Sequence, residues 1–133
     1  MTGENNLDQL LRTMAPVVCP GTFVYCTFSQ ASLPDGLEAI STFREAEGLT
    51  AIVPKANAEA LGLHFEFEST LITLSVHSSL AAVGFLARVC RALAASSIPC
   101  NVVSGFYHDH LFVPCDRLPE ALEALGRLTR GEA

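Results

Sequence analysis

A short pattern that occurs twice, about sixty residues apart, constrains the fold of this chain more than any other feature. Near residue 51 the sequence reads AIVPKANAEALG, and near residue 111 it reads LFVPCDRLPEALEALG. Each copy is an apolar strand that ends in Val-Pro, followed by a helix that carries Glu-Ala-Leu. A repeat at this distance indicates two related units, and chance similarity between two short patterns is the alternative.

The second half of the chain predicts the order strand, helix, strand, strand, helix. An alternating strand over 64–76 is long enough to serve two sheet regions, and a helix is expected from Ser79 to about Ala95. Strands at 98–105 and 108–114 follow, and then a helix over 116–128 with Asp116 as its N-cap. The apolar face of the first of these helices would consist of Leu80, Val83, Ala87, Cys90 and Leu93. This order is the split βαβ arrangement of an α+β, ferredoxin-like fold (βαββαβ), with an antiparallel sheet and helices on one face.

The first half of the chain repeats this order imperfectly. A short helix over 7–14, capped by Asn5 or Asn6, precedes a strand at 21–28, a hairpin over 40–54 and a helix over 55–63 that Gly62 closes. Pro34 and Gly36 break the segment between the first two strands, so that a full helix does not fit there. We therefore expect a degenerate unit over residues 1–66, preceded by the short helix, and a complete unit over residues 67–133.

Composition restricts the classes of function. Of the 133 residues, 50% are hydrophobic and 17% are charged, which is typical of a folded protein, and the net charge of −6 disfavours binding to nucleic acid or to anionic membranes. The N-terminus lacks the basic region and the apolar core of a signal peptide, so we expect a cytoplasmic protein. The five cysteines form no CxxC pair, which favours buried free thiols over a zinc site.

Several segments resemble the ACT domain, particularly the regulatory ACT modules of aspartokinases. The resemblance is carried by SSIPCN at residues 96–101, which matches the start of the family's strand after the helix, and by EAL at residues 123–125. More closely, the chain is similar to a small bacterial family of stand-alone proteins with tandem ACT-like units. The matching segments, which lie between about Leu7 and Leu125, are PVVCPGTFVYC, FREAEGLTAIVP, ITLSVHSSLAAVGFLA and CNVVSGFYHDHLFVP.

The resemblance implies a non-catalytic regulatory or sensor protein. ACT domains bind small ligands, most often amino acids, and transmit that binding to attached enzymes or across a dimer, so that a homodimer is among the expected assemblies and no cofactor is expected. Carried over residue by residue, the ligand-binding positions are Val76, His77, Ser78, Ser79, Leu80, Cys100, Asn101 and Val102. Many ACT loops have a D-x-x-G pattern where this chain has HSSL, so this loop lacks a carboxylate for the amino group of a ligand.

Two of these positions also have purely structural readings. Ser78 or Ser79 would cap the following helix, whose first N–H groups suit a carboxylate, and a cap can contact a ligand as well. Asn101 begins a strand, where asparagine is disfavoured. It would therefore either bind a ligand or hydrogen-bond the backbone of a turn.

The cluster His108-Asp109-His110 has three interpretations. Alternation along a strand places His108 and His110 on one face and Asp109 on the other. The two histidines could bind a metal ion together with His77, but the sequence places no other ligand to complete such a site. A polar patch at the rim of the ligand pocket or at a subunit interface is favoured.

Catalysis has little support, because GxSxG, HExxH and phosphate-binding glycine loops are all missing from the sequence. The alternative to a sensor is a ligand-free module for protein–protein interaction or dimerisation. A preformed cleft lined by Ser78, Ser79 and Asn101 would favour the sensor, whereas a filled cleft would favour the module.

Overall fold

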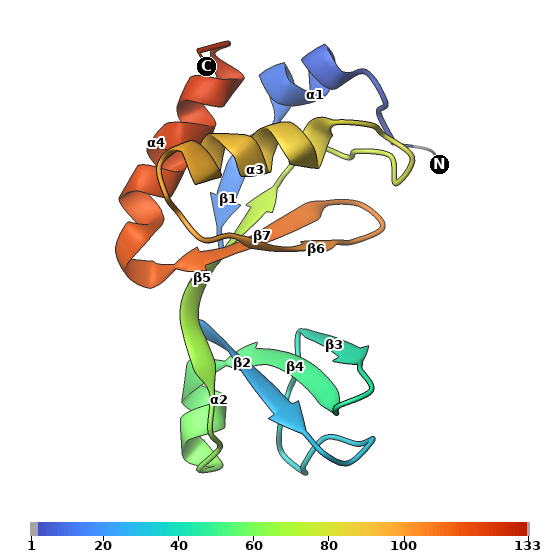
Figure 1. Ribbon diagram of the computed structural model, residues 1–133, viewed down its shortest axis with the longest axis vertical. Coiled ribbons are helices and arrows are strands. Elements are labelled where there is room, and N and C mark those ends of the chain that lie inside the picture. The colour runs from blue at the N-terminus through green and yellow to red at the C-terminus, as the bar shows by residue number, and fades with distance from the viewer. Residues whose placement is uncertain (1–2, 133) are drawn as a thin grey trace. The chain divides into compact units, whose positions relative to one another are not determined.

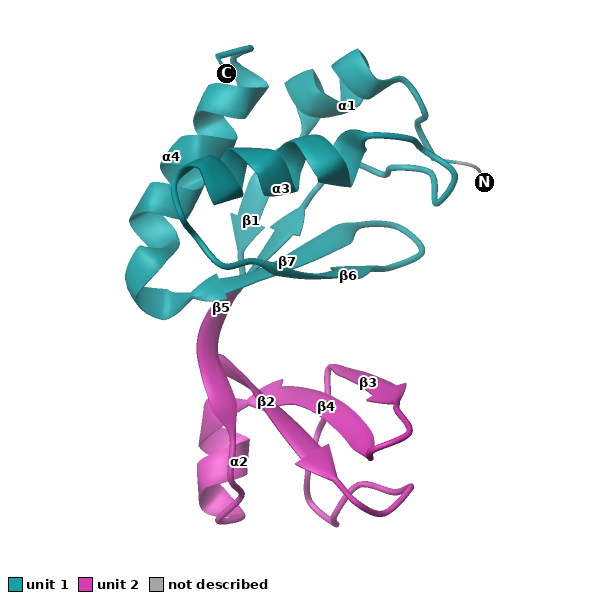
Figure 2. Ribbon diagram, in the orientation of Figure 1, with its two compact units in different colours: residues 1–19, 71–133 teal, residues 20–70 magenta. Residues whose placement is uncertain are grey.

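A computed structural model describes residues 3–132 (Figure 1). Its elements are α1 (Leu7–Thr13), β1 (Pro16–Val18), β2 (Phe23–Phe28), β3 (Ser41–Arg44), β4 (Leu49–Pro54), α2 (Lys55–Ala60), β5 (Glu66–Leu74), α3 (Phe85–Ala95), β6 (Asn101–Ser104), β7 (Asp109–Pro114), a 3₁₀ turn (Cys115–Arg117) and α4 (Leu118–Thr129). The chain forms two compact units (Figure 2). Unit 2 spans Pro20–Thr70, and unit 1 combines the segment that ends at Cys19 with the segment that begins at Leu71.

Unit 2 contains one sheet layer and one helix. Its strands lie in the order β3-β4-β2-β5, and β2 pairs with the first residues of β5. The core residues that the sheet and α2 contribute are Val24, Cys26, Ala51, Val53 and Ala58. As the sequence predicts, a loop rather than a helix connects β2 to β3, and Leu37 from this loop completes the core.

Unit 1 is the complete version of the same arrangement. Its strands lie in the order β1-β5-β7-β6, and β1 pairs antiparallel with the last residues of β5, from Ile72 to Leu74. Three helices, α1, α3 and α4, share a core with these strands, which includes Phe85, Val89, Leu93, Leu111, Val113 and Leu125. Figure 1 shows these helices gathered on one side of the unit 1 strands. The α+β, ferredoxin-like fold with antiparallel pairing is therefore confirmed, and β5 supplies residues to both sheets.

The internal repeat extends to the hairpin before each Val-Pro. In unit 2, Arg44 pairs with Leu49 at the end of the β3–β4 ladder, and in unit 1 Ser104 pairs with Asp109 at the same place in the β6–β7 ladder. The two ladders have the same register along their whole length, and β4 and β7 have the same burial pattern. Leu49 is therefore the structural counterpart of Asp109.

The compact units differ from the contiguous division at residue 66 that the sequence suggests. The N-terminal segment up to Cys19 packs in unit 1, because β1 completes the sheet beside β5 and Leu10, Leu11 and Met14 enter the core of that unit. The chain thus leaves unit 1, forms unit 2 and returns through β5.

Of three helix starts predicted from the sequence, one is confirmed and two are wrong. Asn6 caps α1 by accepting a hydrogen bond from the Gln9 backbone N–H at 2.9 Å, as predicted. The predicted start of α3 at Ser79 is wrong, since the helix begins at Phe85 after Gly84 adopts a left-handed φ of 93°. Asp116 does not cap α4, because it lies in the 3₁₀ turn that follows Pro114 directly.

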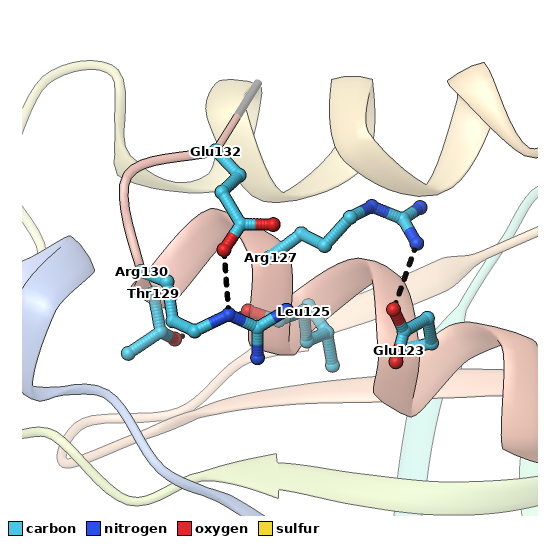
Figure 3. Close-up of polar contacts among 6 residues, drawn as sticks. All are labelled: Glu123, Leu125, Arg127, Thr129, Arg130 and Glu132. Carbon is cyan, nitrogen blue, oxygen red and sulfur yellow. Dashed lines mark hydrogen bonds and ion pairs between the residues drawn. The ribbon is translucent and has the colours of Figure 1, made fainter.

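The end of α4 carries exposed polar contacts, shown in Figure 3. Arg127 donates to Glu123 at 3.2 Å, Arg130 donates to Glu132 at 2.7 Å, and the Thr129 hydroxyl donates to the Leu125 carbonyl. Exposed pairs of this kind contribute roughly 0–1 kcal/mol each, so the buried face of α4 stabilises this helix far more than they do.

Candidate functional site

A pocket of about 150 Å³ lies within unit 1, where the loop after β5 meets the start of α3 and the turn end of the β6–β7 hairpin. Its lining residues are Ser78, Ser79, Leu80, Ala82, Gly84, Phe85, Leu86, Ala87, Ser104 and Asp109. The structure thus brings the predicted residues Ser78, Ser79 and Leu80 together with Asp109. Ser104 was not among the predicted site residues, and its position opposite Asp109 in the hairpin is the signal that would have found it.

Asp109 is the charged residue of this lining, and its side chain is held in place from the loop. The carboxylate oxygen Oδ2 accepts a hydrogen bond of 2.9 Å from the Ser78 hydroxyl, and both residues are buried. Asp109 lies on the helix-facing side of β7, with Leu111 and Val113, because alternate residues of a strand share a face. The carboxylate that the HSSL loop lacks is therefore supplied by the neighbouring hairpin.

The N-terminal segment holds the loop that forms one wall of the pocket. The Glu4 backbone N–H donates to the His77 carbonyl at 2.8 Å, and the Ser79 backbone N–H donates to the Glu4 carbonyl at 2.9 Å. Gly3 packs so closely on this loop that an added Cβ would lie 2.6 Å from backbone atoms of Ser78 and Ser79. We call Gly3 and Glu4 the strap.

The loop between β5 and α3 has its own turn. The Ser79 hydroxyl accepts a hydrogen bond of 3.0 Å from the Ala81 backbone N–H, so it stabilises the loop and does not cap α3. Gly84 takes the cap position without a side-chain hydrogen bond. The first N–H groups of a helix have no carbonyl partner within the helix. In α3 these groups belong to the pocket-lining residues Phe85, Leu86 and Ala87.

The two histidines beside Asp109 make contacts that the carboxylate does not share. His110 Nδ1 lies 2.9 Å from the Thr73 hydroxyl, and His108 Nδ1 lies 3.2 Å from the Val76 carbonyl oxygen. Burial, followed by the charge of His108, lowers the pKa of His110 below its usual value. His77 instead packs against Tyr107, with ring centroids 5.3 Å apart. Among the described residues, no group of three or more His, Cys, Asp or Glu side chains is arranged to hold a metal ion, so His77, His108 and His110 form no such site.

The remaining predicted positions lie outside the lining of the pocket. Asn101 pairs with Phe112, and the ladder alternation places it on the face opposite to Ser104 and Asp109. Cys100 shares a hydrogen bond with Cys90 on α3, and burial together with Cys90 raises the pKa of Cys100 to about 12. Val102 is partly exposed on the helix-facing side of β6. The predicted cleft is thus formed without Asn101.

The corresponding place in unit 2 has different chemistry. A hollow of about 180 Å³ lies there, lined in part by Ser29, Gln30, Arg44 and Leu49 and by the exposed Glu45 and Glu47. Leu49 replaces Asp109 and Arg44 replaces Ser104, and a loop replaces α3. This hollow therefore lacks both the buried carboxylate and the helix start that characterise the pocket in unit 1.

Comparison with known proteins identifies the family. One ACT domain model matches residues 2–70, and a second ACT domain model matches residues 66–127. No curated protein matches the chain. Within residues 3–132, no helix has the length and apolar character needed to cross a membrane.

Solved structures share the fold of this chain. The chain is similar to a protein of unknown function from Vibrio cholerae, with 42% identity over 92% of this chain and 95% of that chain and a TM-score of 0.83. A protein from Agrobacterium tumefaciens is similar at 17% identity, with 87% and 89% of the two chains covered and a TM-score of 0.72. The regulatory subunit of aspartate kinase from Thermus thermophilus shares the fold at 9% identity, with 86% and 97% covered and a TM-score of 0.61. The chain belongs to the ACT domain family and contains two ACT domains in tandem.

Proposed function

We propose that this protein is a non-catalytic regulatory sensor that binds an amino acid in the pocket of unit 1. Membership of the ACT family supports a regulatory, ligand-binding role. The observation that carries the proposal is the pairing of a buried carboxylate, Asp109, with the start of α3 in one small pocket.

The Asp109 carboxylate suits the ammonium group of the ligand. An ionised carboxylate offers about four lone-pair sites, and the hydrogen bond from Ser78 uses one of them. A cation beside a carboxylate in a partly dehydrated pocket forms a stronger, charge-assisted hydrogen bond than two neutral groups do. Ser104, across the hairpin from Asp109, adds a further hydroxyl to this end of the pocket.

The start of α3 suits the carboxylate group of the same ligand. The unpaired N–H groups of the first turn and the positive end of the helix dipole both favour an anion. Gly84 leaves these groups uncovered, because it caps the helix without a side chain. A zwitterion would thus find opposite partners at the two ends of one pocket.

The size of the pocket also favours a small ligand. Its volume of about 150 Å³ is below the roughly 300–1,000 Å³ that is common for drug-sized molecules. Nucleotides and larger cofactors therefore fit this site poorly.

The experiment is a thermal-shift panel of the twenty amino acids at millimolar concentration, followed by calorimetry of each positive ligand. A ligand present at one hundred times its dissociation constant adds about 2.7 kcal/mol to the free energy of unfolding. Binding should disappear in Asp109→Asn, which keeps the shape and removes the charge. It should persist in the matched control Asp116→Asn, whose side chain is exposed in the same unit. A flat panel on a cooperatively unfolding protein would contradict the proposal.

A ligand-free interaction module is the second candidate function. Large apolar side chains are exposed on both units, among them Phe43, Val83, Phe106 and Tyr107, and exposed apolar patches often mark interaction sites. Analytical ultracentrifugation of the chain without added ligand tests this candidate. A stable dimer that no amino acid alters, together with a flat panel, would favour the module.

A further inference from the structure

Exposed apolar side chains adjoin the pocket of unit 1 on two sides. Leu80 and Val83 belong to the loop after β5, and Phe106 and Tyr107 form the turn between β6 and β7. Their relative exposures lie between 58% and 85%. Leu80 lines the pocket itself, and Val83 lies between the lining residues Ala82 and Gly84.

Ring contacts connect these two sides. His77 from the loop after β5 packs on Tyr107 with centroids 5.3 Å apart, and Phe106 packs edge-on against Tyr107 at 5.0 Å. His77 directly precedes the lining residue Ser78, and the turn that carries Phe106 and Tyr107 joins the lining residues Ser104 and Asp109. We call His77, Leu80, Val83, Phe106 and Tyr107 the rim.

We propose that the rim selects amino acids with a large apolar side chain. This inference rests on the proposed function and names the class of ligand for the same site. The ammonium and carboxylate groups would lie in the pocket, between Asp109 and the start of α3. The side chain of the ligand would project past Leu80 and lie against the rings of the rim.

Charge supports this choice of side chain. Among the described residues that line the pocket, Asp109 is the one charged side chain, and the ammonium group of the ligand would use it. A second charge on the ligand would lie against the apolar side chains of Leu80, Phe106 and Tyr107, which offer it no partner of opposite sign, and an unpaired charge that is partly removed from water is unfavourable. Lysine, arginine, aspartate and glutamate are therefore disfavoured.

Apolar area supports it as well. The pocket is too small to enclose a large side chain, and the rim offers apolar surface that water now contacts. Each methylene group removed from water contributes about 0.8 kcal/mol. Two of them already give about a tenfold increase in affinity, so leucine and phenylalanine should bind at least about tenfold more tightly than alanine.

Calorimetry with L-leucine, L-phenylalanine, L-alanine and L-lysine on the full chain tests the inference. Tyr107→Ala should weaken the binding of leucine and phenylalanine by about tenfold and leave that of alanine nearly unchanged, because the methyl group of alanine does not reach Tyr107. Phe43→Ala, which removes an exposed ring from unit 2, is the matched control and should change none of the four affinities. Tyr107 lies on an exposed turn, so its truncation should leave the fold intact.

Two results would overturn the inference and leave the proposed function standing. One is alanine or lysine binding as tightly as leucine and phenylalanine. The other is Tyr107→Ala weakening all ligands equally. A failure of every amino acid to bind would reject the proposed function itself, and the selectivity with it.

Discussion

Ser78 and Asp109 meet in a buried hydrogen bond of 2.9 Å, although 31 residues separate them in the chain. The serine belongs to the loop that in many ACT domains supplies a carboxylate, and the aspartate belongs to the hairpin beside it. β7 thus carries the carboxylate that the HSSL loop lacks, and this residue lines the pocket. Under the proposed function, Asp109 would recognise the amino group for which the HSSL loop has no carboxylate.

The Ser78–Asp109 pair should affect stability and binding differently. Ser78→Ala leaves a buried carboxylate without this donor and should lower the free energy of unfolding by about 1–3 kcal/mol. The double variant Ser78→Ala, Asp109→Leu replaces both partners by apolar groups, and Leu49 occupies the equivalent place in unit 2. It should be close to wild-type stability and should bind no amino acid. Urea unfolding and calorimetry provide the two measurements, and an intact ligand affinity in the double variant would contradict the assignment of the site.

Gly3→Ala should loosen the pocket, although Gly3 is not one of its lining residues. The new Cβ would lie 2.6 Å from the backbone of Ser78 and Ser79. Rotation of a side chain cannot relieve a clash with backbone atoms, so the strap must move away. Loss of the Ser79 N–H to Glu4 carbonyl hydrogen bond should appear as faster amide exchange at Ser79 and as weaker ligand binding.

Gly126→Ala is the matched control for the strap variant. Its Cβ would meet only the flexible end of Arg130, at 3.1 Å, within α4. Alanine is favoured over glycine inside a helix by about 0.8–1.0 kcal/mol, so this variant should be slightly more stable and should bind normally. Unchanged amide exchange at Ser79 in Gly3→Ala would show that the strap does not hold the loop of the pocket.

His110 should make the stability of unit 1 depend on pH. Burial is the main cause that lowers its pKa, and the nearby His108 adds to the effect, whereas Asp109 opposes it. Because the unfolded chain then binds the proton more readily, the contribution of His110 is fully present above the ordinary histidine pKa of about 6.5. It should be lost as the pH falls from that value through the lowered pKa. Unfolding free energies from pH 8 to pH 5 should therefore fall less steeply in His110→Gln than in the exposed control His64→Gln.

The sequence predicts most of the helices and strands well, because these elements follow local patterns. The repeated Val-Pro segments, the loop that replaces the first helix of unit 2 and the long strand at β5 all appear in the structure. The sequence does not predict which unit the N-terminal residues pack against. The packing of α1 and β1 in unit 1 depends on pairing between Pro16–Val18 and Ile72–Leu74. A strand of three residues contains no local pattern that predicts pairing with a strand so far away in the sequence.

The site is predicted less completely than the fold for a similar reason. Ser78, Ser79 and Leu80 follow from the family pattern, but Ser104 lines the pocket only because of the register that pairs it with Asp109. The start of α3 is misplaced because the apolar spacing of Leu80 and Val83 imitates a helix, whereas Gly84 with its left-handed φ breaks it. The family pattern also places Asn101 at the ligand, but strand alternation puts it on the face opposite to Asp109.

One ligand should bind per chain although the chain has two ACT domains. In unit 2 the counterparts of Asp109 and Ser104 are Leu49 and Arg44, and no helix begins at the hollow. The carboxylates that line this hollow, Glu45 and Glu47, are both exposed, and Glu45 already accepts a hydrogen bond from the Thr50 hydroxyl. Neither provides a buried carboxylate like Asp109, and the neighbouring Arg44 would repel an ammonium group. Calorimetry should give a stoichiometry near one in the wild type, and Leu49→Asp should not raise it, because the loop between β2 and β3 provides no helix start for the ligand carboxylate. Two equivalent sites per chain, or retention of full binding in Asp109→Asn, would place the ligand outside the pocket of unit 1.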